Sequence, residues 1–274
     1  MHVPFRKMHG LGNDFVVIDA RARPIAISAR RAAALADRQT GVGCDQLIVL
    51  EPSDNADVRM RIFNPDGSEV EACGNASRAV GVLLANERAD GATRIETLGG
   101  TIVAHAHAHG ISVAMGRPRF GWDEIPLAYA MDTLRMPVGW EDLESPVAVN
   151  VGNPHVVFFV PDCGAVDLAR LGPIIETDPL FPRKINVNVA TLTGPDAITL
   201  RVWERGAGLT RACGTGACAT AIAAMRRRLT GRKVVVTLPG GLLTIDWDDA
   251  DQIIMTGPAT TSFTGAFDEA DYPA

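Results

Sequence analysis

Apolar runs of four to eight residues, separated by glycine, proline and asparagine, recur along the whole chain and predict many β-strands. Residues 58–64 and 198–204 have this character in the two halves of the sequence. The remaining strands are expected at residues 5–7, 15–19, 46–51, 94–97, 101–105, 111–115, 147–151, 155–160, 187–192, 234–238, 242–246 and 252–256.

Helical patterns occupy residues 28–37, 74–87, 166–175 and 214–228, and Ser28 is a suitable N-cap for the first. The segment 214–225 carries no charged residue, and 74–85 carries only Arg78. A helix that is apolar on every side is buried on every side. We therefore expect each half to wrap its sheet round one central helix.

One pattern occurs twice, 140 residues apart and without a gap. Ala72-Cys73-Gly74-Asn75 recurs as Ala212-Cys213-Gly214-Thr215. Polar positions keep the same spacing, namely Asn13 and Asn153, Gln46 and Asn186, Arg61 and Arg201, and Asn64 and Glu204. The repeat predicts two pseudo-symmetric α+β lobes, each a mostly antiparallel sheet or barrel round its helix. We expect residues 1–116 with the tail 260–274 in one lobe, residues 117–259 in the other, and a linker at the start of 117–146.

Composition narrows the class of protein. The chain has 274 residues, of which 47% are hydrophobic and 21% charged, as in ordinary soluble globular proteins. A net charge of −6 argues against nucleic acid as a partner. No apolar stretch reaches the length of a membrane span, and the N-terminus lacks the apolar core of a signal peptide. We therefore expect a cytoplasmic protein with no membrane partner.

Five cysteines are an odd number, which in a reducing compartment argues against a disulfide framework. Their spacings also miss the paired C-x₂-C patterns of structural zinc sites. Cys73 and Cys213 differ from the others because each begins a predicted helix. Backbone N–H groups at a helix N-terminus stabilise a thiolate and also bind carboxylates. Two such units suggest two-base chemistry beside a carboxylate. One thiolate removes a proton from a carbon, and the other thiol returns a proton to the opposite face. This chemistry needs no cofactor and no metal.

Longer motifs carry a resemblance to a known family. They are Lys7-Met8-His9-Gly10-Leu11-Gly12-Asn13-Asp14-Phe15, Gly43-Cys44-Asp45-Gln46, Phe63-Asn64-Pro65-Asp66-Gly67-Ser68, Gly152-Asn153-Pro154-His155-Val156 and the block from Trp203 to Gly216. The chain resembles the diaminopimelate epimerases, which interconvert LL- and meso-diaminopimelate without a cofactor in lysine and peptidoglycan biosynthesis. The resemblance implies a homodimer that acts on a small amino acid.

The resemblance also implies roles for single residues. Cys73 and Cys213 would be base and acid, and His155 and Glu204 would tune the thiol pKa values. The substrate pocket would consist of Asn13, Gln46, Asn64, Gly74, Asn75, Asn153, Asn186, Glu204, Arg205, Gly214 and Thr215. Two residues depart from the family pattern. Ala76 replaces a glycine, and Asn188 stands where the family often has glycine or an apolar residue.

Other interpretations remain open at this point. Asn13 and Asn153 also suit turns, Arg205 a surface ion pair, and His155 a buried core position. Residues His105, His107 and His109 alternate along a strand, where an exposed face is favoured over a metal site. Cys44, Cys163 and Cys218 fit small buried hydrophobes. For the whole protein, the alternatives are a racemase of another amino acid on the same fold, or a non-catalytic amino-acid-binding protein.

Overall fold

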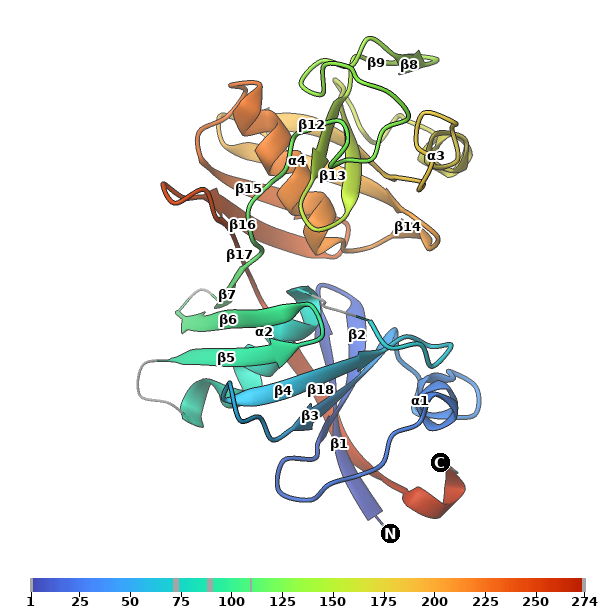
Figure 1. Ribbon diagram of the computed structural model, residues 1–274, viewed down its shortest axis with the longest axis vertical. Helices are drawn as coiled ribbons and strands as arrows, with labels where there is room; N and C mark the ends of the chain where they lie inside the picture. Colours follow the sequence, from blue (N-terminus) through green and yellow to red (C-terminus); the bar gives the residue numbers. More distant parts are fainter. Residues whose placement is uncertain (1, 71–73, 88–90, 109, 273–274) are drawn as a thin grey trace. The chain divides into compact units, whose positions relative to one another are not determined.

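The computed structural model describes residues 2–70, 74–87, 91–108 and 110–272, and the chain divides into two compact units (Figure 1). Unit 1 comprises Met1–Val113 together with Gly257–Ala274, and unit 2 comprises Ala114–Thr256. Each unit buries its own apolar cluster. In the part of the chain that the structure describes, no helix has the length and apolar character needed to cross a bilayer.

Unit 1 is built on one twisted sheet with the strand order β7-β6-β5-β4-β3-β2-β1-β18. The strands are β1 (His2–Gly10), β2 (Asn13–Asp19), β3 (Gln46–Glu51), β4 (Val58–Phe63), β5 (Ala92–Thr97), β6 (Gly100–His107), β7 (Gly110–Ala114) and β18 (Thr260–Asp268). All neighbours are antiparallel except the pairs β2–β3 and β4–β5. The sheet is therefore mostly antiparallel, as predicted.

Two helices pack against this sheet. In α1 (Ala29–Ala36), the Ser28 side chain caps the helix by accepting a hydrogen bond from the Arg31 N–H at 3.1 Å. Helix α2 (Gly74–Leu84), which continues into the 3-10 turn η1 (Ala85–Glu87), contacts β1, β5 and β6. These strands lie towards opposite ends of the strand order. The sheet therefore curls round α2, and Arg78 in this helix is fully buried.

Unit 2 repeats the plan with the order β10-β11-β12-β13-β15-β16-β17 and with β14 added to β13. The strands are β8 (Gly139–Trp140), β9 (Leu143–Glu144), β10 (Val147–Asn150), β11 (Pro154–Phe159), β12 (Asn186–Gly194), β13 (Ala197–Glu204), β14 (Gly208–Thr210), β15 (Lys233–Leu238), β16 (Gly241–Trp247) and β17 (Ile253–Gly257). Helix α4 (Gly214–Arg226) contacts β10, β11, β12, β13, β15 and β16. Figure 1 shows it against the strands labelled β12, β13, β15 and β16. Every residue of α4 from Gly216 to Met225 is buried, as its uncharged sequence predicts.

The internal repeat is visible in the strand register. Phe15 pairs with Gln46 between the parallel strands β2 and β3, and His155 pairs with Asn186 between β11 and β12. The second pair lies 140 residues after the first at both of its positions, since 155 follows 15 and 186 follows 46 by that number. A one-residue slip would move every side chain to the other face of its strand. The two units therefore share this strand register to the residue.

The segment 117–146 packs onto unit 2 and is more than a linker. Its residues Ile125, Leu127, Met136 and Leu143 are buried in the apolar cluster of that unit. Helix α3 (Leu168–Glu176), capped by Asp167, covers the same cluster with Leu171 and Ile175. At the other end of the chain, β18 pairs with β1 from His2 to His9. The last residues of the chain thus complete the sheet in which the first residues lie.

Candidate active site

Cys213 lies at the N-terminus of the central helix of unit 2. It is the N-cap of α4, and its Sγ accepts a hydrogen bond from the Gly216 N–H at 3.2 Å. The Thr215 hydroxyl lies 3.5 Å from the same sulfur. Helix geometry leaves the N–H groups of Gly214 and Thr215 without intrahelical acceptors, so this end can receive a carboxylate. The predicted thiol and the predicted carboxylate cradle therefore lie in one helical turn.

The surroundings of Cys213 keep its sulfur protonated. Burial raises the pKa of Cys213 well above its usual value, and the negative charge of Glu204 raises it further. The hydrogen bonds from Thr215 and Gly216 act in the opposite direction, because they stabilise the thiolate. The side chain is only 4% exposed. In this state Cys213 is a thiol that can donate a proton.

Glu204 and Arg205 follow each other at the end of β13. Glu204 accepts a hydrogen bond from the Thr210 hydroxyl, and the Arg205 guanidinium donates to the carbonyl of Arg183 at 3.0 Å. Within the described residues, Arg205 forms no ion pair, so the structure gives no support for a surface ion pair as its role. Its exposed guanidinium suits a carboxylate, and the Glu204 carboxylate suits an ammonium group.

Asn186 connects two segments of this half-site. Its amide donates to the Pro154 carbonyl at 2.8 Å and accepts from the Arg205 N–H at 2.9 Å. The side chain is 3% exposed. Asn186 thus fixes the backbone of Arg205 against the start of β11. Its observed contacts are those of a residue that positions its neighbours.

His155 is completely buried, and it also contacts two other polar side chains. Its Nε2 lies 2.9 Å from Asn153 Oδ1, and its Nδ1 lies 3.0 Å from Asn188 Nδ2. Burial, with the nearby positive charge of Arg205, lowers the pKa of His155 to about 3, so the ring is neutral at pH 7. Asn153 in turn donates to the Thr215 hydroxyl at 3.3 Å. Asn153 is therefore tied to the start of α4 and is more than a turn residue.

Unit 1 carries the matching arrangement at the start of α2. Asn75 donates to Asn13 Oδ1 at 3.1 Å, and Asn13 donates to Asp45 Oδ2 at 3.0 Å. Arg78 completes the chain by donating to Asn75 Oδ1 at 2.8 Å. Cys73 lies outside the described residues, and α2 begins at the next residue, Gly74. The structure thus describes the polar setting of this half-site without its thiol.

The remaining predicted residues of unit 1 differ in their contacts. Gln46 begins β3, and its buried Oε1 has no hydrogen-bond partner among the residues that the structure describes. An unsatisfied buried acceptor costs free energy until a donor arrives, so this oxygen can take a ligand N–H. Asn64 instead donates to the Ser68 hydroxyl at 3.1 Å within its own turn.

Sequence reasoning missed the roles of Asp45 and Asn188. Asp45 lies in the motif Gly43-Cys44-Asp45-Gln46. Its carboxylate orients Asn13 by accepting a hydrogen bond from the Asn13 amide, and it also accepts from the Asp14 N–H at 3.0 Å. The Arg38 guanidinium forms ion pairs with both Asp45 and Asp14 and so holds Asp45 in place. Burial would raise the pKa of Asp14, but hydrogen bonds from Arg38 and Lys7 lower it to about 2. The departure of Asn188 from the family pattern was the available signal for that residue.

Other candidate groups stay outside the half-sites. Along β6, the His105 and His107 rings lie on the exposed face and Ala104 on the buried one; His109 is not described. No group of metal ligands occurs within the residues that the structure describes. Cys44, Cys163 and Cys218 are buried, as expected for structural cysteines.

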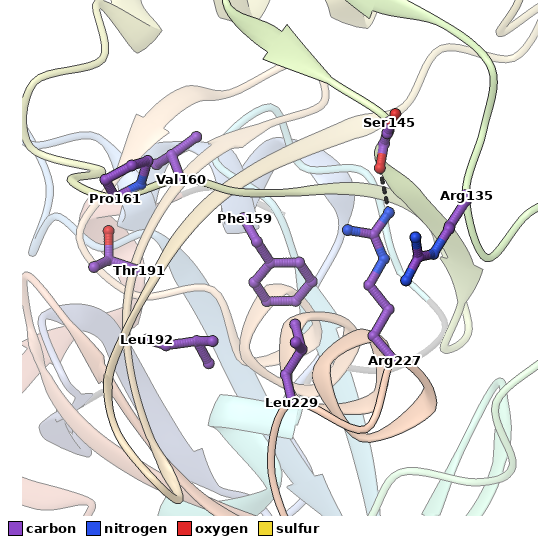
Figure 2. Close-up of a pocket in the computed structure, with 9 residues that line it drawn as sticks. All are labelled: Arg135, Ser145, Phe159, Val160, Pro161, Thr191, Leu192, Arg227 and Leu229. Carbon is purple, nitrogen blue, oxygen red and sulfur yellow. Dashed lines mark hydrogen bonds between the residues drawn. The ribbon is translucent and has the colours of Figure 1, made fainter.

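A surface pocket of about 530 Å³ in unit 2 is separate from the predicted residues (Figure 2). It lies beyond the C-terminal end of α4, and Phe159, Leu192 and Leu229 form its apolar wall. Arg227 lines it but donates to the carbonyls of Leu134 and Ser145. These bonds attach the segment 134–145 to the helix end. The pocket contains none of the predicted site residues.

Solved structures identify the fold. A PhzF-family phenazine biosynthesis protein from Enterococcus faecalis matches with a TM-score of 0.72 at 15% identity, over 98% of this chain and 100% of that chain. A hydroxyproline epimerase from Agrobacterium vitis matches with a TM-score of 0.66 at 14% identity, over 98% and 94%. At these identities the likeness concerns the fold alone. The protein shares its fold with the PhzF-family protein and the hydroxyproline epimerase, which confirms the predicted fold class.

Sequence comparison then identifies the family. The family model described as diaminopimelate epimerase matches residues 5–121 and 147–262. A diaminopimelate epimerase of Erythrobacter litoralis is 67% identical over 99% of this chain and 100% of its own length. One from Rhizorhabdus wittichii is 64% identical over 100% of this chain and 98% of its own. The chain belongs to the diaminopimelate epimerase family.

Proposed function

We propose that this protein epimerises diaminopimelate, converting the LL form to the meso form with two cysteines and no cofactor. The observation that carries the proposal is the thiol of Cys213 at the N-terminus of α4, hydrogen-bonded by Gly216 and Thr215 and close to Glu204. Relatives of near-equal length that are named diaminopimelate epimerase support the choice of substrate.

The reaction moves one proton off a carbon and another onto it. The thiolate of one cysteine, Cys73 or Cys213, removes the α-proton and becomes a thiol. The electron pair left on carbon takes a proton from the other thiol at the opposite face, and that sulfur becomes the thiolate. Backbone N–H groups at the helix start stabilise the charge that develops on the adjacent carboxylate. The two cysteines exchange roles when the direction reverses.

We assign the rest of the pocket by the chemistry of each end of the substrate. Diaminopimelate carries a carboxylate and an ammonium at each of two carbons. The carboxylate at the reacting carbon meets the N–H groups of Gly214, Thr215, Gly74 and Asn75. Arg205 binds the distant carboxylate and Glu204 an ammonium, while the amides of Asn13, Gln46, Asn64, Asn153 and Asn186 serve both. His155 and Glu204 tune the thiol pKa values.

Solvent deuterium tests the proposal directly. In D₂O the enzyme is expected to place deuterium at an α-carbon of LL-diaminopimelate, as observed by NMR and mass spectrometry. Proline, lysine and histidine, tested in parallel, separate this activity from that of another racemase. General acid–base groups contribute roughly 10²–10⁴-fold, so Cys73→Ala and Cys213→Ala are each expected to lower epimerisation by at least that factor. Either variant retaining near-normal turnover refutes the two-cysteine assignment, and absence of exchange with every substrate indicates a binding protein.

We further propose a cytoplasmic homodimer with no nucleic-acid or membrane partner. Strand β18 ends the strand order of unit 1, and Phe263 on it is 52% exposed. An unpaired strand edge with an exposed aromatic residue is a suitable surface for a second copy of the chain. Light scattering on the purified protein gives the mass, and a monomer at working concentrations contradicts this part of the proposal.

A further inference from the structure

Asn188 occupies a fixed orientation beneath the start of α4. It is fully buried on β12, and its Nδ2 donates to the Val156 carbonyl at 3.2 Å and faces His155 Nδ1 at 3.0 Å. A carbonyl oxygen can only accept, so the amide nitrogen must be the group that faces both atoms. His155 Nδ1 therefore accepts, and the single proton of the neutral ring lies on Nε2.

This proton determines the direction of every hydrogen bond that follows. Nε2–H donates to Asn153 Oδ1 at 2.9 Å, which leaves the Asn153 amide nitrogen to donate to Thr215 Oγ1 at 3.3 Å. A hydroxyl that accepts one hydrogen bond keeps its own proton for another acceptor. Among the described residues, the other hydrogen-bond partner of Thr215 Oγ1 is Cys213 Sγ, at 3.5 Å. The donors thus follow one another from Asn188 to the sulfur without a reversal.

We propose that Asn188 is a positioning residue for the reaction: through His155, Asn153 and Thr215, it directs a hydroxyl proton onto the Cys213 thiolate. This inference rests on the proposed catalytic role of Cys213. Within the described residues, Asn188 forms no hydrogen bond to the sulfur, and none to the helix N–H groups that are proposed to receive the substrate. Its effect is to select which tautomer of His155, and hence which orientation of the Asn153 amide, the half-site contains.

The other half of the molecule provides an internal comparison. Positions 15 and 48, which match His155 and Asn188 in the repeat, are Phe15 and Ile48, and both are fully buried. There Asp45 orients Asn13, so the Asn13 amide turns its oxygen towards α2. In unit 2 the amide of Asn153 turns its nitrogen towards α4. The same asparagine of the repeat therefore presents an acceptor in one unit and a donor in the other.

Close packing at Gly216 holds Asn188 in this place. A Cβ on Gly216 would lie 2.8 Å from Asn188 Oδ1 and 3.2 Å from Cys213 Sγ. The first turn of α4 can approach Asn188 closely only because position 216 has no side chain. Asn188 and Cys213 thus both pack closely against one glycine.

The test is a double-mutant cycle on the purified full-length enzyme. Asn188→Leu keeps a similar shape and removes the donor, and Thr215→Val removes the last hydroxyl. One hydrogen bond to a charged group corresponds to roughly a 10-fold effect or more, so each variant is expected to lower kcat by about that factor. The loss appears in both directions, because the Cys213 thiolate is the reactant in one and the product in the other. The double variant is expected to lose no more than the worse single variant.

A spectroscopic signature separates positioning from general packing. ¹⁵N NMR of labelled histidine is expected to show His155 as the Nε2–H tautomer in the wild type and as a mixture, or as Nδ1–H, in Asn188→Leu. Thr220→Val is the matched control. Thr220 is a fully buried residue of α4, and its hydroxyl has no hydrogen-bond partner within the described part of the chain. That variant should change neither the tautomer nor kcat.

Each outcome decides a definite point. Additive losses in the cycle, an Nδ1–H tautomer in the wild type, or a fall in kcat for Asn188→Leu with the tautomer unchanged overturns the positioning role. If the tautomer changes while kcat stays the same and Cys213→Ala is still inactive, the coupling from Asn188 to the sulfur is refuted and the catalytic assignment stands. If Cys213→Ala also retains turnover, the proposed function itself fails.

Discussion

At the scale of single residues, the environment of Cys213 favours the acid over the base. Burial and the charge of Glu204 both oppose ionisation, and two hydrogen bonds favour it. A substrate ammonium beside Glu204 would cancel the effect of the Glu204 charge on the pKa of Cys213. The thiol would then ionise more readily when substrate is bound than when the site is empty. Glu204 thus links the ionisation of Cys213 to the binding of substrate.

The burial of His155 predicts a change in stability with pH. Its pKa is lowered to about 3 in the folded protein, while in the unfolded chain it has the ordinary value of about 6.5. Below pH 6.5 the unfolded state therefore binds a proton that the native state refuses. The free energy of unfolding should fall as pH falls from 6.5 towards 3, by up to about 1.4 kcal/mol per pH unit from this group.

His155→Phe tests this source, because the matching position in unit 1 is already Phe15. Urea unfolding at pH 7, 6 and 5 should show a shallower pH dependence for the variant, although its stability at pH 7 will also fall because Asn153 and Asn188 lose a partner. Equal slopes for the two proteins would mean that His155 does not titrate as described.

The sequence allowed more to be predicted about which residues form the site than about how they act. The repeat and the family motifs identified Cys213, Asn153 and Glu204, and the structure places all three near the start of α4. The orientation of an amide is different, since it depends on partners distant in sequence. Asp45 sets it for Asn13, and His155 with Asn188 sets it for Asn153. No local pattern contains that information.

At the scale of elements, the first turn of α4 depends on a glycine that its counterpart in α2 lacks. Position 216 corresponds to Ala76 in α2, whose methyl group is fully buried. In unit 2, a methyl group on residue 216 would meet Asn188, Val202 and the sulfur of Cys213 at 2.8, 3.0 and 3.2 Å. The two central helices thus differ in how closely the neighbouring strands approach. In unit 2, β12 and β13 leave no room for a side chain at position 216, whereas position 76 of α2 accommodates a methyl group.

Gly216→Ala should therefore be harmful although alanine is the better helix former. Overpacking in a dense core costs about 1–3 kcal/mol, which exceeds the gain of up to about 1 kcal/mol in helix propensity. We expect a lower unfolding midpoint in urea and reduced turnover. Gly194→Ala is the control, because its added Cβ meets only the Ala197 Cβ at 3.4 Å. Equal stability of Gly216→Ala and wild type would show that β12 and β13 can move away from α4.

The elements themselves were largely predictable, and their order in the sheets was not. Period and composition located the helices to within two or three residues at each end. The uncharged part of α4 was correctly expected to be buried, as residues 216–225 are. Parallel neighbours such as β2 and β3 are joined through α1 and long loops, however, and local sequence does not specify such pairings. The repeat helped here, because it required both units to make the same choice.

At the scale of the whole molecule, the proposed reaction requires both sulfurs to reach one carbon. Thiols on opposite sides of a single α-carbon can join when that carbon is absent and their Cβ atoms come within about 4.5 Å. We expect an oxidant to form a Cys73–Cys213 disulfide that abolishes activity, with recovery after addition of a thiol reductant. Peptide mapping identifies the bond, and Cys213→Ala should not form it. Full activity under strong oxidation, with both thiols shown to be free, would contradict this expectation.

The course of the chain through the two units has a consequence for biosynthesis. Unit 2 is one continuous segment, whereas unit 1 needs β18 from the far end of the chain to cover β1. A ribosome releases the N-terminus first, so β1 emerges about 250 residues before its partner strand. During that interval the nascent β1 edge is open to wrong pairing, and unit 2 can reach its native state earlier than the unit that is translated first. Chaperone dependence should therefore fall on the half of the enzyme that is made first.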